Sequence, residues 1–223
     1  MRNMDIIIGD DIREAAPSLR VLVIETRISN SPTTEAVKAL MRQTAGLIKE
    51  HYALADINGR PGIAATRAAY KACGKEPNRY RPSQEQLCRR IVSGKELYFV
   101  SNVVDVINVI SILSGHSIGG FDADSIDGPS LTLGIGRPGE PYEGIGRGPL
   151  NIEGMPVYRD ATGGVGTPTS DNERTKTSLS TSRLLMCVNM YGEEMGADEV
   201  TELSRKLLKT HCGAEDFSAR IVN

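Results

Sequence analysis

Aromatic side chains are scarce in this sequence: they make up 4% of its 223 residues, and none is tryptophan. Proteins that bind bare single-stranded nucleic acid offer aromatic side chains on which bases stack, so this scarcity argues against such a platform. The net charge is only −2, which argues against a general binder of nucleic acid or of anionic membranes. Any contact with RNA would therefore need a local basic patch.

Clusters of metal-ligating side chains are also missing. The three histidines are scattered along the chain. The cysteines show neither close pairing nor the spacing of a metal site: Cys73, Cys88, Cys187 and Cys212. A zinc site would need a cluster of such residues. The sequence therefore predicts no metal and no cofactor, and the unpaired cysteines favour reduced thiols in a cytoplasmic protein.

Long apolar runs are absent too. The longest covers residues 103–113, is interrupted by Asp105, Asn108 and Ser111, and is too short to span a bilayer. The N-terminus has no basic region followed by an apolar stretch, which is the pattern of a signal peptide. We expect a cytoplasmic protein without a membrane partner.

Helical patterns fill the first half of the chain, and short strands separated by Gly and Pro fill the second. Capping residues and apolar periodicity predict helices over residues 33–52, 61–73, 82–93, 101–114 and 198–210. Apolar runs predict strands over residues 6–8, 20–28, 131–133, 157–159, 184–188 and a short end at 221–222. Strands and helices do not alternate, so we expect an α+β fold. No convincing linker divides residues 1–223, which favours a single compact domain.

The predicted helix over residues 101–114 is apolar almost all round, which indicates a core helix. Polar side chains interrupt it at intervals of three: Asn102, Asp105, Asn108 and Ser111. Each step of three falls about 60° short of a full turn, so the first three share a face and the last lies at its edge. A buried polar group without a partner costs about 1–3 kcal/mol. The stripe therefore either pins a neighbouring loop or lines a wet pocket, and both interpretations stay open.

Glycines follow this helix. Gly119 and Gly120 precede Phe121, and the pair is typical either of a turn or of a place where backbone N–H groups approach a ligand. Residues 134–139 have the form of a dinucleotide-binding fingerprint, but prolines follow where that fingerprint needs a helix. We therefore expect a tight turn that presents Glu140.

Two segments carry basic side chains that an RNA end could contact. Residues 163–182 are polar and include Asp171, Arg174, Thr175 and Lys176. The second segment carries Arg79, Arg81, Arg89, Arg90 and Lys95. Such runs are most often solvated surface. Flanking a Gly-rich β region, they would also suit a structured RNA end.

A series of short motifs appears in a characteristic order. It includes Arg67-Ala68-Ala69-Tyr70, Tyr80-Arg81-Pro82-Ser83, NVVDVIN at residues 102–108, GHSIGGFD at residues 115–122, Gly139-Glu140-Pro141 and DNERTKT at residues 171–177. In this order the motifs resemble the tRNA-binding and editing domain in the beta subunit of phenylalanyl-tRNA synthetase. The likeness is greatest to the small stand-alone proteins built from that domain, and it covers residues 60–190.

The resemblance implies an α+β module with a sandwich-like core of mixed or antiparallel sheets, flanked by helices. The synthetase domain hydrolyses tyrosine that has been wrongly esterified to the phenylalanine tRNA. By this resemblance, the chain is expected to bind the aminoacylated 3′ end of a tRNA and to hydrolyse the ester. It is not expected to bind DNA. It has no ATP site, so it is not expected to charge tRNA by itself.

The helix pattern and the resemblance together give the candidate residues. The reacting part of the pocket is expected at Asn102, Asn108, Gly119 and Gly120. Contacts to the substrate are expected from Asp105, Ser111, Glu140, Asp171, Arg174 and Thr175. Gly119 stands where the family's pocket has a histidine. Two other hypotheses are a non-catalytic protein that binds a small amino-acid-like ligand in the same pocket, and a structural partner of another synthetase subunit.

Overall fold

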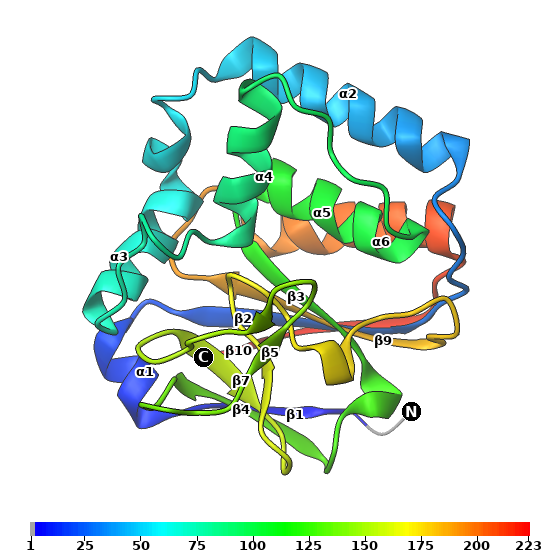
Figure 1. Cartoon of the computed structure of the whole chain (residues 1–223). Coiled ribbons are helices and arrows are strands. Elements are labelled where there is room, and N and C mark those ends of the chain that lie inside the picture. Colours follow the sequence, from blue (N-terminus) through cyan, green and yellow to red (C-terminus); the bar gives the residue numbers. More distant parts are fainter. Residues whose placement is uncertain (1–2) are drawn as a thin grey trace.

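Two β-sheets pack face to face, and a layer of helices covers the outer face of one of them (Figure 1). The computed structural model describes residues 3–223. The sheet under the helices is antiparallel and has the strand order β10-β2-β9-β3. Its strands are β2 (Arg20–Arg27), β3 (Ser117–Asp122), β9 (Arg183–Met190) and β10 (Glu215–Val222).

The second sheet has the order β1-β4-β7-β8 and is mixed, because β1 runs parallel to β4 while the other pairs are antiparallel. Its strands are β1 (Asp5–Ile8), β4 (Ser130–Ile135), β7 (Pro156–Arg159) and β8 (Gly164–Gly166). A small hairpin of β5 (Glu143–Gly144) and β6 (Gly148–Pro149) stands beside it. The predicted α+β fold, with a sandwich-like core of mixed and antiparallel sheets, is confirmed.

Six helices lie within residues 3–223, and all but the first begin and end close to the predicted positions. They are α1 (Asp10–Ala15), α2 (Glu35–His51), α3 (Pro61–Ala72), α4 (Ser83–Val92), α5 (Asn102–Ser114) and α6 (Ala197–Cys212). Single 3-10 turns lie at Ile57–Gly59, Ala123–Ser125 and Glu173–Thr175. Ser101 caps α5 by accepting the Val104 N–H, and Gly115 ends it with a φ of 74°. Both ends agree with the helix predicted over residues 101–114, since Ser is a common N-cap and Gly a common residue at the C-terminal end of a helix.

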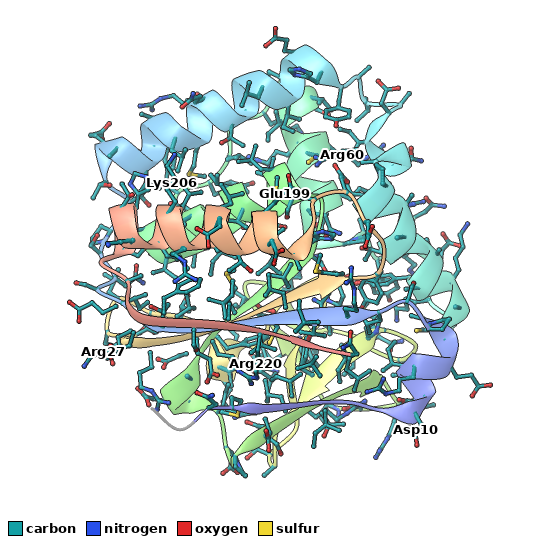
Figure 2. The ribbon with its side chains drawn as sticks, turned by 180° about the vertical axis from the view of Figure 1, so that it is seen from behind. Asp10, Arg27, Arg60, Glu199, Lys206 and Arg220 are labelled. Carbon is teal, nitrogen blue, oxygen red and sulfur yellow. The ribbon has the colours of Figure 1, made fainter. Side chains whose placement is uncertain are left out.

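Alternate side chains of β2 pack into two different hydrophobic cores. Leu22 and Ile24 face the helices, in a core that includes α2, α5 and α6. Val21 and Val23 face the second sheet, in the core between the sheets. Because side chains alternate across a strand, one strand stabilises both layers. Figure 2 shows the arrangement from behind, with α6 lying over β10 and β2.

Arg220, labelled in Figure 2, lies on β10 and links the two sheets at the edge where β10 and β1 are the outermost strands. Its guanidinium is 2.7 Å from the buried Glu25 carboxylate of β2 and also donates to the carbonyl of Met4, which precedes β1. The other Glu25 oxygen accepts the Met4 N–H at 2.9 Å. The buried carboxylate is thus paired and hydrogen-bonded, as a buried charge must be.

Several elements differ from the sequence prediction. Gly119 and Gly120 lie inside strand β3, which was not predicted, and the short strands β5, β6 and β8 were not predicted either. The apolar end predicted at residues 221–222 is the last part of the eight-residue strand β10. Helix α1 was not predicted. Over residues 3–223, none of the helices combines the length and the apolar character needed to cross a bilayer.

Candidate functional site

Helix α5 is the central element of the site, but two of its polar side chains are used to join helices and loops. Asn102 accepts the Thr34 N–H at 2.9 Å and donates to the His211 carbonyl at 3.0 Å, so it ties the start of α2 to the end of α6. Ser111 donates to the His116 carbonyl at 2.7 Å and fixes the turn before β3. Both side chains are buried and satisfied.

Asp105 is also satisfied away from any cavity. Its carboxylate accepts the Thr33 hydroxyl at 2.6 Å and the Val100 N–H at 3.2 Å. Burial raises the pKa of this carboxyl, and these two hydrogen bonds partly oppose the rise. Asn102, Asp105 and Ser111 therefore hold neighbouring segments in place, which is the first of the two interpretations of the polar stripe. None of the three lines the cavity described next.

Asn108 is different, because its half-buried side chain lines a cavity and has no hydrogen-bond partner within residues 3–223. The cavity has a volume of about 360 Å³ and lies between α5, β3 and the segment of residues 167–177. Its apolar lining consists of Val100, Val104, Ile107, Ile118 and Ile145. Its other lining residues are Ser83, Asn108, Gly120, Thr167, Ser170, Asp171, Lys176 and Thr177. An apolar hollow with a few convergent polar groups is typical of a small-molecule site. We call it the α5 cavity.

Asp171 is the acidic group of the α5 cavity. One of its oxygens accepts the Gly120 N–H at 3.2 Å, and its side chain has no other hydrogen bond within the described residues. Burial raises the pKa of Asp171 to about 7, against the smaller opposing effect of the Gly120 N–H. Lys176 also lines the cavity, but its ammonium is paired with Glu173. Near neutral pH, Asp171 can therefore both accept and release a proton.

The two glycines of β3 lie on opposite faces of the strand. Gly120 lines the α5 cavity, and a Cβ there would lie 2.6 Å from the Ile107 Cδ1 atom, so a side chain would crowd α5. A Cβ at Gly119 would instead lie 2.4 Å from the Phe121 ring, which belongs to the core between the sheets. The position that the resemblance matches to the family histidine thus faces away from the α5 cavity.

The remaining predicted contact residues are placed elsewhere. Glu140 is held by Arg159 at 2.6 and 2.7 Å in the turn after β4. Arg174 is paired with Asp160 at 2.8 Å. Thr175 is buried and donates to the Val165 carbonyl at 3.3 Å. Of the ten predicted site residues, the structure brings together Asn108, Gly120 and Asp171.

Most of these elements match a known protein family. The family model described as the B3/4 domain matches residues 65–206, which include α5, β3 and Asp171. The chain belongs to the B3/4 domain family. The resemblance to the domain of the phenylalanyl-tRNA synthetase beta subunit is thereby confirmed. Strands β1, β2 and β10, which complete the two sheets, lie outside the B3/4 match.

Among solved structures, the chain is similar to an N-terminal fragment of the phenylalanyl-tRNA synthetase beta subunit from Pyrococcus horikoshii. The TM-score is 0.49 at 12% identity, and the match covers 99% of this chain. The chain spans 55% of the length of that fragment. A search of curated protein sequences finds none that matches.

Basic side chains lie next to the α5 cavity in this B3/4 domain. Ser83, the first residue of α4, lines the cavity, and the outer side of α4 forms a hollow of about 270 Å³. We call the cations of that hollow the α4 basic surface: Arg81, Arg89, Arg90 and Lys95. Arg79 and Arg147 line a second hollow of about 300 Å³ that shares Arg81. The sequence indicated this basic segment but not Arg147, which comes from the β5–β6 hairpin.

Sequence reasoning also missed most of the residues that line the α5 cavity. Thr167 and Ser170 belong to a segment that was described only as polar, and Ile145 and Val100 come from loops without a motif. Val104 and Ile107 were assigned to the core. The position of Val104 gave a usable signal, because it lies four residues before Asn108 and so on the same face of the helix.

Proposed function

We propose that the α5 cavity receives the aminoacyl group at the 3′ end of an aminoacyl-tRNA and that the protein hydrolyses the ester. The cavity's volume of about 360 Å³ is at the small end of the range for ligand sites, which suits one amino-acid side chain. Its apolar walls would hold that side chain. The observation that carries the proposal is Asp171, a half-buried carboxyl with a pKa of about 7 beside the unpartnered amide of Asn108.

The reaction needs only water and positioned polar groups. Asp171 would take a proton from a water molecule while the water oxygen attacks the ester carbonyl carbon. The Asn108 amide would donate to the carbonyl oxygen as it gains negative charge. The bond between the carbonyl carbon and the ribose oxygen would then break, and Asp171 would return the proton to that oxygen. No nucleophilic side chain is required.

The α4 basic surface supports an RNA partner. Its four cations lie on one side of α4, whose first residue lines the α5 cavity. Two of them, Arg81 and Arg89, lie within 3.7 and 3.8 Å of the Glu85 carboxylate, which is itself paired with Arg67. Phosphate groups bound here would release counterions, so binding should weaken steeply as salt is added.

The test is release of amino acids from a panel of aminoacyl-tRNAs. The wild-type protein should release at least one amino acid faster than buffer, and Asp171→Asn should lower that rate by about 100- to 10,000-fold. Asp5→Asn is the control, because Asp5 is an exposed acid of β1, far from the site in the other sheet. The catalysed rate should rise with pH and level off above about 7, whereas uncatalysed hydrolysis keeps rising. Equal rates for wild type and Asp171→Asn would rule out this role.

A second candidate function is non-catalytic binding of a small amino-acid-like ligand. The observation in its favour is that position 119 carries no side chain and faces Phe121, so no histidine enters the α5 cavity. In the same panel, this function predicts saturable binding that depends on Asn108 and Asp171 without release of any amino acid.

A further inference from the structure

The segment of residues 95–100, which joins α4 to α5, exposes three consecutive large apolar side chains. Tyr98 is 69% exposed, Phe99 44% and Val100 61%. Among residues 3–223, Tyr98 and Phe99 are the aromatic residues that are exposed; the others are buried or half-buried. Figure 1 shows the segment crossing the helical layer from the end of α4 to the start of α5. A run of exposed apolar residues is rarely kept without a function.

The structure holds this segment in place at both ends. Leu97 is inserted into the core beneath the helices. The Val100 N–H donates to the buried carboxylate of Asp105, as described above. Tyr98 and Phe99 therefore project from a fixed backbone, and their exposure is a property of the fold.

A cation lies against each of the two exposed rings. The guanidinium carbon of Arg90 is 3.9 Å from the Tyr98 ring centroid, and the Lys38 ammonium is 5.6 Å from that of Phe99. Phe99 and Lys95 also line a hollow of about 270 Å³ against α2, which contributes Arg42 and Lys49. The hollow contains one acidic side chain, Glu96. The surroundings of the rings are therefore predominantly cationic.

The position of the segment connects these rings to the site. Val100, the next residue after Phe99, lines the α5 cavity. Lys95, at the other end of the segment, belongs to the α4 basic surface. The backbone that carries the two rings thus runs from a surface that suits phosphate groups to the α5 cavity.

We propose that Tyr98 and Phe99 are a stacking platform for the unpaired nucleotides at the 3′ end of an RNA. This rests on the proposed function, in which the terminal aminoacyl group enters the α5 cavity and the preceding nucleotides lie outside it. Bases of any sequence stack on aromatic rings, for about 1–3 kcal/mol per base, and neighbouring cations bind the linking phosphates. The cations favour RNA over an apolar protein surface. The scarcity of aromatic residues argued against such a platform, but two rings in the right place are enough to form one.

The experiment measures binding of a short 5′-fluorescein-labelled RNA by anisotropy. The RNA is a hairpin that ends in four unpaired nucleotides, ACCA, and carries no amino acid. Tyr98→Ala and Phe99→Ala should each raise the Kd by about 5- to 150-fold, and Tyr98→Phe should bind like wild type because it keeps the ring. Ile7→Ala is the matched control, since Ile7 is 51% exposed on β1 of the other sheet. A blunt-ended hairpin should bind weakly and be insensitive to all four substitutions.

The outcomes separate this proposal from the proposed function. If the alanine variants bind the unpaired RNA as well as wild type does, the platform is overturned even where aminoacyl-tRNA is hydrolysed. If the rings matter but no aminoacyl-tRNA is hydrolysed, the platform stands and the hydrolysis fails. If sedimentation shows that wild type self-associates, that Tyr98→Ala abolishes this and that RNA binding is unchanged, the rings serve a protein interface and the proposal is wrong.

Discussion

Asp105 and Asp171 are two carboxyls with raised pKa values, and their partners distinguish their roles. Asp105 is fully buried and accepts hydrogen bonds from Thr33 and Val100, so it holds the start of α5 and the segment before it. Asp171 accepts a single bond, from Gly120, and lines a cavity. A carboxyl with unused acceptor capacity beside a cavity is available to a ligand or a water molecule.

At the residue scale, the raised pKa of Asp171 predicts how its removal changes stability with pH. The folded-state pKa of about 7 lies above the ordinary value of 3.8, so the unfolded chain ionises first and wild type loses stability as pH rises from 4 to 7. Asp171→Asn keeps an acceptor for Gly120 and does not ionise. We expect it to be more stable than wild type by about 1–3 kcal/mol above pH 7, since solvent in the cavity reduces the full effect.

Urea unfolding at pH 4, 5, 6, 7 and 8 measures this difference. The advantage of Asp171→Asn should grow between pH 4 and 7 and stay constant above that range. Asp5→Asn, at the exposed acid of β1, should show little change over the same range. A difference between Asp171→Asn and wild type that does not vary with pH would contradict the raised pKa.

At the element scale, the boundaries of α5 could be predicted from sequence. The residues that its polar side chains contact could not. Ser101 and Gly115 mark its ends because capping is local chemistry. The polar stripe turns about 60° with each step, so Asn102 meets α2 and α6 while Asn108 meets a cavity. Which neighbour each side chain meets depends on the packing of distant elements.

Strand β3 and the choice of Asp171 show the same limit. Gly119 and Gly120 have low intrinsic preference for a strand, but pairing with Cys187 and Met186 of β9 holds them in one. That pairing joins residues far apart in sequence. Glu173 lies two residues from Asp171, so the sequence alone does not exclude it as the acidic group of the cavity. The fold decides for Asp171, because Glu173 is turned to Lys176 and Gly146.

Replacing each of two helical glycines with alanine should change the stability of the protein in opposite directions. Gly46 is exposed on α2, and a Cβ there would have no atom within 4 Å. Gly46→Ala should therefore raise the free energy of unfolding by about 0.5–1 kcal/mol. A Cβ at Gly62, near the start of α3, would lie 2.5 Å from the Gly115 carbonyl oxygen. Gly62→Ala should lower that free energy by about 1–3 kcal/mol, because backbone would have to move.

Chemical denaturation of wild type and of the two variants measures both changes in the free energy of unfolding. A stabilised Gly62→Ala protein would mean that α3 does not approach the α5–β3 turn as closely as the structure has it. A destabilised Gly46→Ala protein would contradict the open environment of α2.

At the scale of the whole molecule, both cores depend on the sheet between them. Ile24 of β2 is buried against the helices, whereas Leu133 of β4 is buried between the sheets. Because β2 and β9 contribute side chains to both cores, we expect residues 1–223 to unfold as one cooperative unit. Ile24→Ala and Leu133→Ala should each destabilise the protein by about 2–5 kcal/mol.

Far-UV circular dichroism and tyrosine fluorescence, followed during urea unfolding, test this cooperativity. The two signals should change together for wild type and for both variants. A variant in which one signal changes at a lower urea concentration than the other would show that the layers unfold separately, and the prediction of a single domain would then be wrong.

The proposed function requires that the α5 cavity binds an aminoacyl group. An NMR titration can locate the binding site, with an adenosine whose 3′ position carries an amino acid through a stable amide in place of the ester. We predict that the largest shifts occur at the backbone N–H of Gly120 and Asp171 and at the side-chain amide of Asn108, and that Asn108→Ala weakens binding. Shifts confined to other surfaces, or no shifts at millimolar ligand, would show that the α5 cavity is not the aminoacyl site.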